Sequence, residues 1–347
     1  MKILHITESF GGGVTSAINS YVKNSSQFSH YLFATVRHQD ETGEEQTGNF
    51  LSKMLVNRSV KSLFLLYKYI KKVKPDIVHL HSTYAGAIVR VLPFISKSKI
   101  VYTPHGFSFL RNESVLNKKL YFLIERILSR RTEVIAACGL DEKLIAQKFV
   151  HPFKTHEIIN VCDEIEYATN HLPNRDRPCF VMVGRVSEQK GYVFFAEVAQ
   201  KVTGFADMVW IGGGEDNATK LLVESGVKVT GWLERKDVLD HLSNADYYFH
   251  SAAWDGFPIS VLEAAKMNKP MILRDIGPFS SEGLKTVCSV EQAVEEIKLL
   301  MKNDSLTKQR VKSNSEKINE RHTKENLQKA LNSLYDSFRP SEYELNL

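Results

Sequence analysis

The sequence has no long hydrophobic run and few cysteines, and each absence excludes a class of protein. No apolar stretch approaches the roughly 20 residues that a membrane-spanning helix needs. The opening residues, MKILHITESF, lack the apolar stretch of a signal peptide and are typical of a first β-strand. The four cysteines are isolated, without the paired spacing of a disulfide framework or a zinc site, and they fit free thiols in a reducing compartment. They are Cys138, Cys162, Cys179 and Cys288.

The composition is that of a globular protein with an uneven distribution of charge. Hydrophobic residues make up 43% and charged residues 24%, which excludes a disordered chain. A length of 347 residues is too great for one ordinary core and predicts two domains. Residues 1–170 carry 22 Lys and Arg against 15 Asp and Glu, whereas the rest is slightly acidic. The basic half either meets an anionic partner or is an ordinary solvated surface.

Short runs rich in Val and Ile alternate with amphipathic stretches, and this alternation occurs twice along the chain. Strand–helix alternation predicts a parallel sheet with helices on both faces, so the fold class is α/β with two doubly wound, Rossmann-like domains. The polar stretch 170–178 predicts the linker, and 38–50 a surface loop. The predicted strands are 2–6, 31–36, 76–80, 99–103, 133–137, 157–161, 179–183, 207–211, 227–230, 246–250 and 270–273. The predicted helices are 14–24, 60–73, 84–93, 114–131, 189–202, 215–225, 235–244, 260–267, 291–302 and 316–338.

Glycine-rich turns follow two of the predicted strands, where such sheets bind ligands. Glycines 11–13 precede a helix, and consecutive glycines let the backbone approach a ligand while a helix N-terminus favours an anion. A plain strand–helix turn explains them as well. A second turn, at 212–214, repeats the pattern. Neither turn completes the dinucleotide fingerprint, which disfavours an oxidoreductase.

Two cations five residues apart lie on the loop that opens the second half. In GRVSEQKG, residues 184–191, Arg185 offers a planar fork of donors and Lys190 a point charge, so both can converge on a diphosphate. Taken alone, the segment is equally a loop with two solvated cations.

Segment 250–270, HSAAWDGFPISVLEAAKMNKP, is the most specific part of the sequence. Asp255 lies on a turn fixed by Gly256 and Pro258, and Glu263 lies on the helix that follows. Carboxylates suit the hydroxyl groups of a neutral sugar because each oxygen accepts hydrogen bonds. Separately, the two residues would be a capping Asp and an exposed helical Glu. In the turn TGWL, at 230–233, backbone groups can read a base edge, and the Trp232 ring is interpreted as packing.

These segments together resemble the GT-B family of retaining glycosyltransferases called family 4, which includes many enzymes of bacterial polysaccharide and glycolipid synthesis. The resemblance covers nearly the whole chain and depends on GGG at 11–13, TPHGF at 103–107, GRVSEQKG, IGGGE at 211–215, TGWL and above all SAAWDGFPISVLEAA. It implies an acceptor-binding domain at 1–172 and a nucleotide-sugar-binding domain at 173–318, with the donor cleft between them. It also implies that 319–347 form a C-terminal helix that crosses back to the first domain.

The resemblance implies a role for each candidate residue. Arg185 and Lys190 hold the donor diphosphate, Glu263 accepts hydrogen bonds from the ribose hydroxyls, Asp255 binds the transferred hexose and His105 lies near its reacting face. The implied catalytic residues are His105, Arg185, Lys190, Asp255 and Glu263. The implied donor-binding residues are Gly12, Gly13, Arg185, Lys190, Gly213, Trp232, Leu233, Gly256, Phe257, Pro258 and Glu263.

The implied chemistry needs no metal and no cofactor, because cations and a helix N-terminus neutralise the departing diphosphate. The sequence agrees, since it shows no DxD-like acidic pair beside a strand end. Three positions depart from the family pattern. In IINVCD, residues 158–163, the glycine that usually follows the asparagine is missing, which predicts a differently shaped loop. Asp255 replaces the usual glutamate, which puts the identity of the hexose in doubt, and Asn268 replaces the usual glycine, a mild change because Asn tolerates left-handed backbone.

The expected partners are a UDP- or GDP-sugar and a glycan or glycolipid acceptor, without nucleic acid, in the cytoplasm. Stretches 60–73 and 114–131 mix apolar and basic residues, so the protein either binds the anionic inner face of the plasma membrane or merely has two solvated basic helices. Two alternatives remain for the activity. One is a GT-B nucleotide-sugar epimerase or hydrolase, and the other is a non-catalytic nucleotide-sugar-binding protein.

Overall fold

The structure is a computed structural model that divides the chain into two compact units. It describes residues 1–8, 10, 12–36, 48–111, 113–165, 175–302 and 304–339. Unit 1 comprises Met1–Val161 with Lys324–Leu347, and unit 2 comprises Cys162–Thr323. Each unit is described by itself. Gly11, most of the predicted loop 38–50 and the first half of the predicted linker lie outside the described residues.

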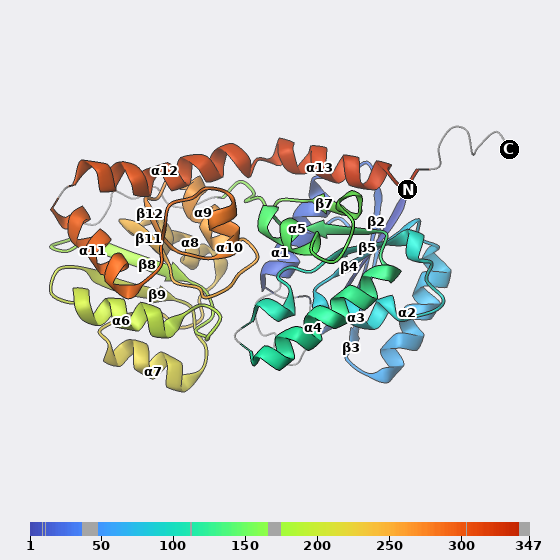
Figure 1. Cartoon of the computed structure of the whole chain (residues 1–347), viewed down its shortest axis with the longest axis horizontal. Coiled ribbons are helices and arrows are strands. Elements are labelled where there is room, and N and C mark those ends of the chain that lie inside the picture. Colours follow the sequence, from blue (N-terminus) through green and yellow to red (C-terminus); the bar gives the residue numbers. More distant parts are fainter. Residues whose placement is uncertain are drawn as a thin grey trace. The chain divides into compact units, whose positions relative to one another are not determined.

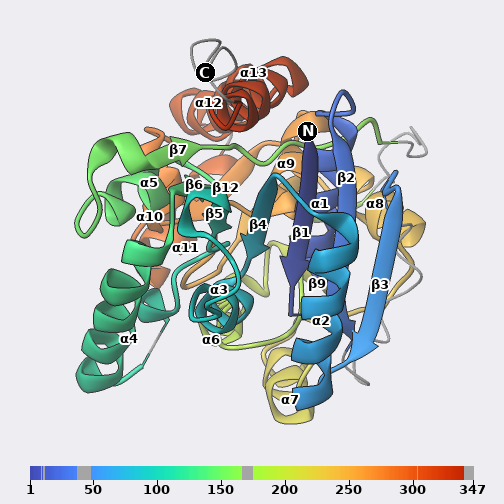
Figure 2. The ribbon, with the colours of Figure 1, turned by 90° about the vertical axis from the view of Figure 1, so that its right-hand side faces the viewer.

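The described part of unit 1 is built on a seven-stranded parallel sheet in the order β3-β2-β1-β4-β5-β6-β7 (Figures 1 and 2). Central strands such as β1 are buried on both faces, which explains their nearly continuous apolar sequence. The strands are β1 Lys2–Thr7, β2 Ser29–Val36, β3 Ser52–Asn57, β4 Ile77–His81, β5 Ile100–Thr103, β6 Val134–Ala137 and β7 Thr155–Glu157. The helices are α1 Gly12–Lys23, α2 Val60–Val73, α3 Thr83–Arg90, α4 Val115–Leu128, α5 Leu140–Ala146 and α13 Lys324–Asp336.

The described part of unit 2 repeats this architecture with a six-stranded parallel sheet in the order β10-β9-β8-β11-β12-β13 (Figure 1). Its core includes Trp210, Phe195 and Phe249 from one face and Tyr248 and Phe279 from the other. The strands are β8 Cys179–Val183, β9 Asp207–Ile211, β10 Lys228–Val229, β11 Tyr247–His250, β12 Met271–Arg274 and β13 Thr286–Val287. The helices are α6 Tyr192–Val202, α7 Asp216–Glu224, α8 Arg235–Ser243, α9 Ile259–Lys266, α10 Gly277–Ser281, α11 Val290–Met301 and α12 Ser305–Arg321. The two-domain α/β fold predicted from the sequence is confirmed.

The unit boundaries differ from the predicted ones for reasons of packing. Unit 2 begins at Cys162 rather than at 173, because Cys162 and Ile165 pack against its core. The single helix predicted at 316–338 is interrupted at His322, where ψ is 56°. Ile318 on α12 still belongs to the core of unit 2, so the return to unit 1 begins at Lys324 instead of 319.

Several short elements also correct the sequence analysis. The strand predicted at 157–161 is wrong, because β7 ends at Glu157 and the apolar residues after it are buried without joining a ladder. Strand β3, which has one half-buried face, was missed, as were β13, α5 and α10. Asn268 has a φ of 54°, the left-handed backbone predicted for a residue in place of glycine. No helix among the described residues is both long and apolar enough to span a bilayer.

Helix α13 is held in unit 1 by its apolar face. Leu327, Leu331, Leu334 and Tyr335 are buried in a cluster with residues of β1 and α1. We expect Leu331→Ala to lower the free energy of unfolding by about 2–5 kcal/mol, because the removed side chain leaves a cavity. Chemical denaturation measures the effect. Leu306→Ala on α12, where the side chain is 74% exposed, is the matched control and should cost about 0.5 kcal/mol or less.

Candidate active site

The loops that follow β8 and β9 are packed backbone against backbone. A Cβ on Gly212 would lie 2.2 Å from the carbonyl oxygen of Gly184, and a Cβ on Gly214 would lie 2.1 Å from that of Val186. Trp210 Nε1 also donates a hydrogen bond to the Gly184 carbonyl at 2.8 Å. Two of the three glycines at 212–214 therefore serve this close approach, a structural requirement that the sequence analysis read as a ligand turn.

The loops after β8 and β11 are joined in the same way. Gly191 has a φ of 71°, and a Cβ there would lie 2.0 Å from the Ser251 carbonyl oxygen. Ser251 Oγ donates to the Lys190 carbonyl at 2.8 Å, and Ala253 N donates to the Gln189 carbonyl at 2.9 Å. These contacts bring the end of GRVSEQKG beside the DGFP turn.

Lys190 and Asp255 form an ion pair at this junction. Lys190 Nζ contacts Asp255 Oδ2, and the two side chains are only 19% and 14% exposed. Burial raises the pKa of Asp255, but the Lys190 ammonium, then His250, and the hydrogen bonds from Lys190 and Gly256 N together hold it below its ordinary value. Asp255 is therefore an anion held against a cation, with its Oδ1 accepting from Gly256 N at 2.9 Å.

The DGFP turn presents backbone rather than an aromatic ring. Phe257 adopts a φ of 66°, and its ring is buried, 4.0 Å from that of His322 and 5.6 Å from that of Phe279 between centroids. Pro258 is the N-cap residue of α9. The Phe257 side chain thus anchors the turn in the core.

Glu263 lies on α9 and is paired with a cation that the sequence analysis missed. Its side chain is 4% exposed, and Glu263 Oε1 lies 2.7 Å from the Arg235 guanidinium. Burial raises the pKa of Glu263, and Arg235 opposes that rise. Arg235 is 61% exposed and begins α8 directly after TGWLE. Its position just beyond a predicted ligand turn was the available signal.

Tyr248 and His250 lie near these carboxylates, and both were missed. Tyr248 Oη lies 3.1 Å from His250 Nδ1 and 2.9 Å from Ser260 Oγ. Burial and the nearby charges of Asp255 and Glu263 raise the Tyr248 pKa. Burial and the Lys190 ammonium lower the pKa of His250 to about 3, so this imidazole is neutral at pH 7. Polar residues alternating along the apolar strand DYYFH were the sequence signal for this pair.

Arg185 and Trp232 form a second, more exposed part of the site. The Arg185 guanidinium lies 5.9 Å from the centroid of the Trp232 ring, and that ring is 59% exposed. A Cβ on Gly213 would lie 2.7 Å from Trp232 Nε1, so this glycine makes room for the indole. Leu233 instead packs against the core of unit 2. The packing expected of Trp232 is therefore only partial, since the indole lies against Gly213 while more than half of the residue is exposed.

The predicted residues of unit 1 lie at the ends of β1 and β5. Gly12 begins α1, and a Cβ on Gly13 would meet nothing within 4 Å. His105 follows β5 with a φ of 53°. Its Nε2 lies 3.1 Å from His81 Nδ1 and its Nδ1 lies 3.2 Å from Cys138 Sγ, so both ring nitrogens are engaged inside unit 1. Burial lowers the pKa of His105 to about 4.

Glu142 supports this loop from α5. Its carboxylate accepts hydrogen bonds from Gly106 N at 2.6 Å and from Cys138 N at 2.8 Å, which ties the segments after β5 and β6 together. Burial raises the pKa of Glu142 to about 7.

Comparison with known proteins supplies independent information. Two families match adjacent parts of the chain: Glycosyltransferase Family 4 matches residues 28–163 and Glycosyl transferases group 1 matches residues 163–318. The chain is 28% identical over 298 residues to an uncharacterized 41.2 kDa protein in the cps region of Klebsiella pneumoniae, covering 80% of this chain and 81% of that protein. It is 29% identical to an Escherichia coli UDP-Gal:alpha-D-GlcNAc-diphosphoundecaprenol alpha-1,3-galactosyltransferase, covering 63% of this chain and 62% of the relative.

The solved structures extend the likeness in fold. HepE of Anabaena, solved in complex with UDP and glucose, superimposes with a TM-score of 0.74 at 17% identity, covering 97% of this chain and 100% of HepE. WaaG, a glycosyltransferase involved in lipopolysaccharide biosynthesis, superimposes with a TM-score of 0.67 at 13% identity, covering 98% and 100%.

We expect Lys190→Gln to raise the pKa of Asp255 above its ordinary value, because burial remains while the main opposing cation is lost. In the wild type, the lowered pKa stabilises the fold above the pKa of the unfolded chain, and this contribution is lost as the pH falls through the folded value. In the variant, the contribution of Asp255 falls as the pH rises instead. NMR titration of the Asp carboxyl carbons measures the change. Lys201→Gln, which removes an exposed ion pair with Glu291, should leave the Asp255 titration unchanged.

Proposed function

The chain belongs to the family 4 glycosyltransferases of GT-B fold, and on that premise we propose that it transfers a hexose or N-acetylhexosamine from a UDP- or GDP-sugar to a lipid-linked glycan. The buried Lys190–Asp255 ion pair carries the proposal, since it holds together one cation for a diphosphate and one carboxylate for a sugar. The names of the relatives support surface polysaccharide synthesis as the setting, and the UDP and glucose bound by HepE support a UDP-sugar as the donor.

The ion pair suggests how the donor is received. A diphosphate carries more charge than one carboxylate and competes with Asp255 for the Lys190 ammonium. As Lys190 turns to the phosphates, Asp255 is released to accept hydrogen bonds from sugar hydroxyls. The exchange keeps each buried charge partnered, which avoids the large penalty of an isolated one. Arg185, exposed beside Trp232, supplies the second cation for the leaving diphosphate.

We propose a similar exchange of partners at the nucleoside end of the donor, between Glu263 and Arg235. The Glu263 carboxylate accepts the ribose hydroxyls in place of the exposed Arg235 guanidinium, which can move into solvent at little cost. The Trp232 ring, which is 59% exposed, offers a surface against which a base can stack. The contacts to the donor are thus divided among loops that the same parallel sheet positions.

We propose a retaining, metal-independent reaction. Charge develops on the β-phosphate as the glycosidic bond breaks, and Arg185 and Lys190 are already placed to stabilise it. Asp255 and Glu263 are each matched by a cation of the chain, which favours substrate hydroxyls over a divalent ion as their ligands. His250 remains neutral beside Lys190 and adds no competing charge.

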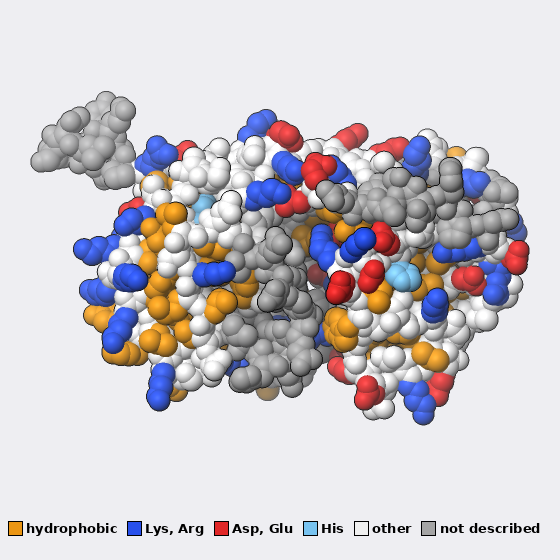
Figure 3. Space-filling model, turned by 180° about the vertical axis from the view of Figure 1, so that it is seen from behind, with side chains coloured by type: hydrophobic (Ala, Val, Ile, Leu, Met, Phe, Trp, Pro, Cys, Tyr) orange, Lys and Arg blue, Asp and Glu red, His pale blue; other side chains and the backbone are white. Residues whose placement is uncertain are grey.

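The proposed binding of the acceptor and of a membrane surface is based on two helices of unit 1, α4 and α2. Helix α4 exposes six large hydrophobic side chains, an unusual number for a surface helix, and basic residues lie among them. Helix α2 exposes four large hydrophobic side chains, also among basic residues, with Lys68 Nζ 4.4 Å from the centroid of the exposed Phe64 ring. On the side that Figure 3 shows, unit 1 presents Lys and Arg among hydrophobic side chains, with few acidic ones. We propose that these two helices bind the anionic surface that carries a lipid-linked acceptor.

Glu263→Gln is expected to weaken binding of the donor by about tenfold or more, because the charged acceptor of the ribose hydroxyls is lost. Isothermal titration against UDP- and GDP-sugars measures this affinity, with the exposed Glu224→Gln as the control. A transfer assay with lipid-linked glycan then tests the reaction. The product should keep the anomeric configuration of the donor, and chelators should leave the rate unchanged.

The same assay separates the alternatives. Free sugar or an epimerised nucleotide sugar, without transfer to any glycan, would indicate the epimerase or hydrolase. Binding without turnover would indicate a nucleotide-sugar-binding protein. Inversion of configuration, or a rate abolished by chelation and restored by Mg²⁺ or Mn²⁺, would contradict the proposed mechanism.

Reversal of charge at Lys118 and Lys119 on α4 tests the membrane proposal. We expect Lys118→Glu/Lys119→Glu to bind anionic phosphatidylglycerol vesicles about tenfold or more weakly, since each basic residue contributes about 1 kcal/mol at such a surface. Sedimentation with vesicles measures binding, and neutral phosphatidylcholine vesicles give the baseline. Lys220→Glu/Lys302→Glu in unit 2 changes the net charge equally and should bind like the wild type. Equal loss in both variants would contradict a specific membrane face.

A further inference from the structure

Four imidazoles inside unit 1 form one continuous hydrogen-bonded chain that ends at His105. His30 Nε2 lies 2.9 Å from the Ser25 carbonyl oxygen, and His30 Nδ1 lies 3.0 Å from His5 Nε2. His5 Nδ1 then lies 3.0 Å from His81 Nε2, and His81 Nδ1 lies 3.1 Å from His105 Nε2. The members come from β2, β1, β4 and the loop after β5, so the chain runs across the sheet.

At the Ser25 end of this row of imidazoles, the direction of hydrogen-bond donation is fixed. The Ser25 carbonyl can only accept a hydrogen bond, and the Ser25 hydroxyl donates its proton to the Tyr21 carbonyl at 2.6 Å. His30 Nε2 must therefore be the donor. Burial lowers the pKa of His30, so this ring carries only one proton and its Nδ1 is an acceptor.

The direction then passes from ring to ring. Burial also lowers the pKa of His5, His81 and His105, so each is neutral and has one donor and one acceptor nitrogen. Because His30 Nδ1 accepts, His5 donates through Nε2 and must accept at Nδ1. His81 therefore donates through Nε2 to His5, and His105 donates through Nε2 to His81. The last acceptor, His105 Nδ1, faces the Cys138 thiol, whose proton is retained because burial raises its pKa.

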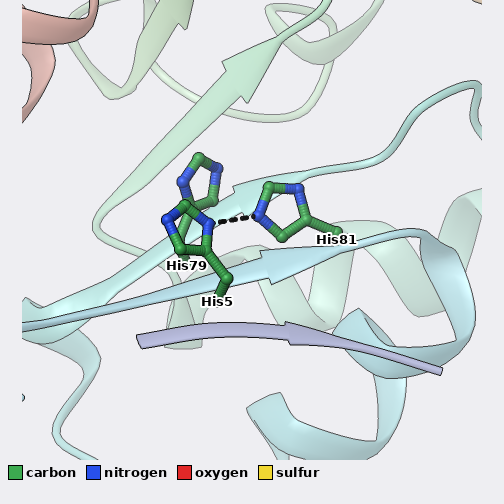
Figure 4. Close-up of side chains that lie close together, drawn as sticks. All are labelled: His5, His79 and His81. Carbon is green, nitrogen blue, oxygen red and sulfur yellow. Dashed lines mark hydrogen bonds between the residues drawn. The ribbon is translucent and has the colours of Figure 1, made fainter. Parts of the chain in front are cut away.

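This arrangement is unsuited to moving protons or holding a metal. A proton entering at His105 would have to leave through the Ser25 carbonyl, which does not give it onward. His5, His79 and His81 have nitrogens within 4.8 Å of one another (Figure 4). Those nitrogens already hydrogen-bond: His5 with His81, and His79 with Tyr335 Oη and Thr103 Oγ1.

We propose that His30, His5 and His81 are positioning residues that fix the Nε2–H tautomer and the ring orientation of His105. The kinetic part of this inference rests on the proposed transferase activity, with His105 beside the reacting sugar. His81 holds one ring nitrogen of His105 and Cys138 holds the other. His105 therefore serves as a neutral residue of fixed orientation and not as a proton acceptor. The other titratable groups near it are Tyr21, Cys138 and His79, and Glu142 binds the main chain of the next residue, Gly106.

Nitrogen-15 NMR of the imidazole rings tests the tautomer directly and needs no activity. In the wild type, His30, His5, His81 and His105 should all show the neutral Nε2–H form at pH 6 and at pH 8, although Glu142 changes its charge between them. A charged His105 ring, or a proton on its Nδ1, would overturn the proposal.

His5→Phe and His79→Phe form a matched pair, because both residues are fully buried in one cluster and only His5 belongs to the chain. His5→Phe should mix the tautomers of His105 and lower kcat about tenfold while KM for the donor changes little, the size of one lost hydrogen bond. His79→Phe should leave the His105 signals and kcat near those of the wild type. His5→Gln, which keeps a donor and an acceptor, should recover part of the loss.

The outcomes separate this inference from the proposed function. Equal losses of kcat in both Phe variants at equal melting temperature would mean that the row of imidazoles has only a structural role, and would overturn the inference. A wild type without transferase activity would refute the proposed function and leave the NMR test standing. If His5→Phe does not fold, the wild-type spectrum and His5→Gln still decide.

Discussion

The candidate site depends on one interaction, the ion pair between Lys190 and Asp255 at the carboxyl ends of β8 and β11. A buried charge is costly unless it is partnered, so neither side chain would be retained there without the other. The Lys190 ammonium keeps the pKa of Asp255 low, whereas burial is the main reason that His250 stays neutral. An ammonium is the kind of group that a diphosphate requires, and a carboxylate is the kind that a sugar hydroxyl requires, which is why the proposed function is built on this pair.

Backbone packing holds these charges in place. The loops that carry Lys190 and Asp255 touch at Gly191 and Ser251, where no side chain would fit, and the loop after β9 closes against Gly184 through Gly212. Glycine is therefore used here to bring loops together rather than to admit a ligand. A fixed loop loses little freedom when a ligand binds, which favours affinity from few polar contacts.

The sequence predicted the architecture well, because buried parallel strands are continuous apolar runs that need no knowledge of their neighbours. Strand β3, half-exposed at the edge of its sheet, lacked that signal. The sequence analysis also singled out Arg185, Lys190 and Asp255 on loops after strands and Glu263 on α9, and their roles stay predictions. Arg235, Tyr248 and the partners of His105 were not singled out, because contacts between side chains far apart in the sequence depend on tertiary packing.

The shorter carboxylate at position 255 gains a physical meaning from its contacts. Asp255 Oδ1 accepts a hydrogen bond from Gly256 N within its own turn, while Oδ2 meets Lys190. A glutamate has one more methylene and would carry its carboxylate beyond the turn, away from the main-chain donor. Aspartate therefore reaches less far than glutamate, but both of its oxygens are held in place. A carboxylate that stays this close to the backbone reaches less far from the turn than a glutamate would, and we propose that this shorter reach bears on which hexose the site accepts.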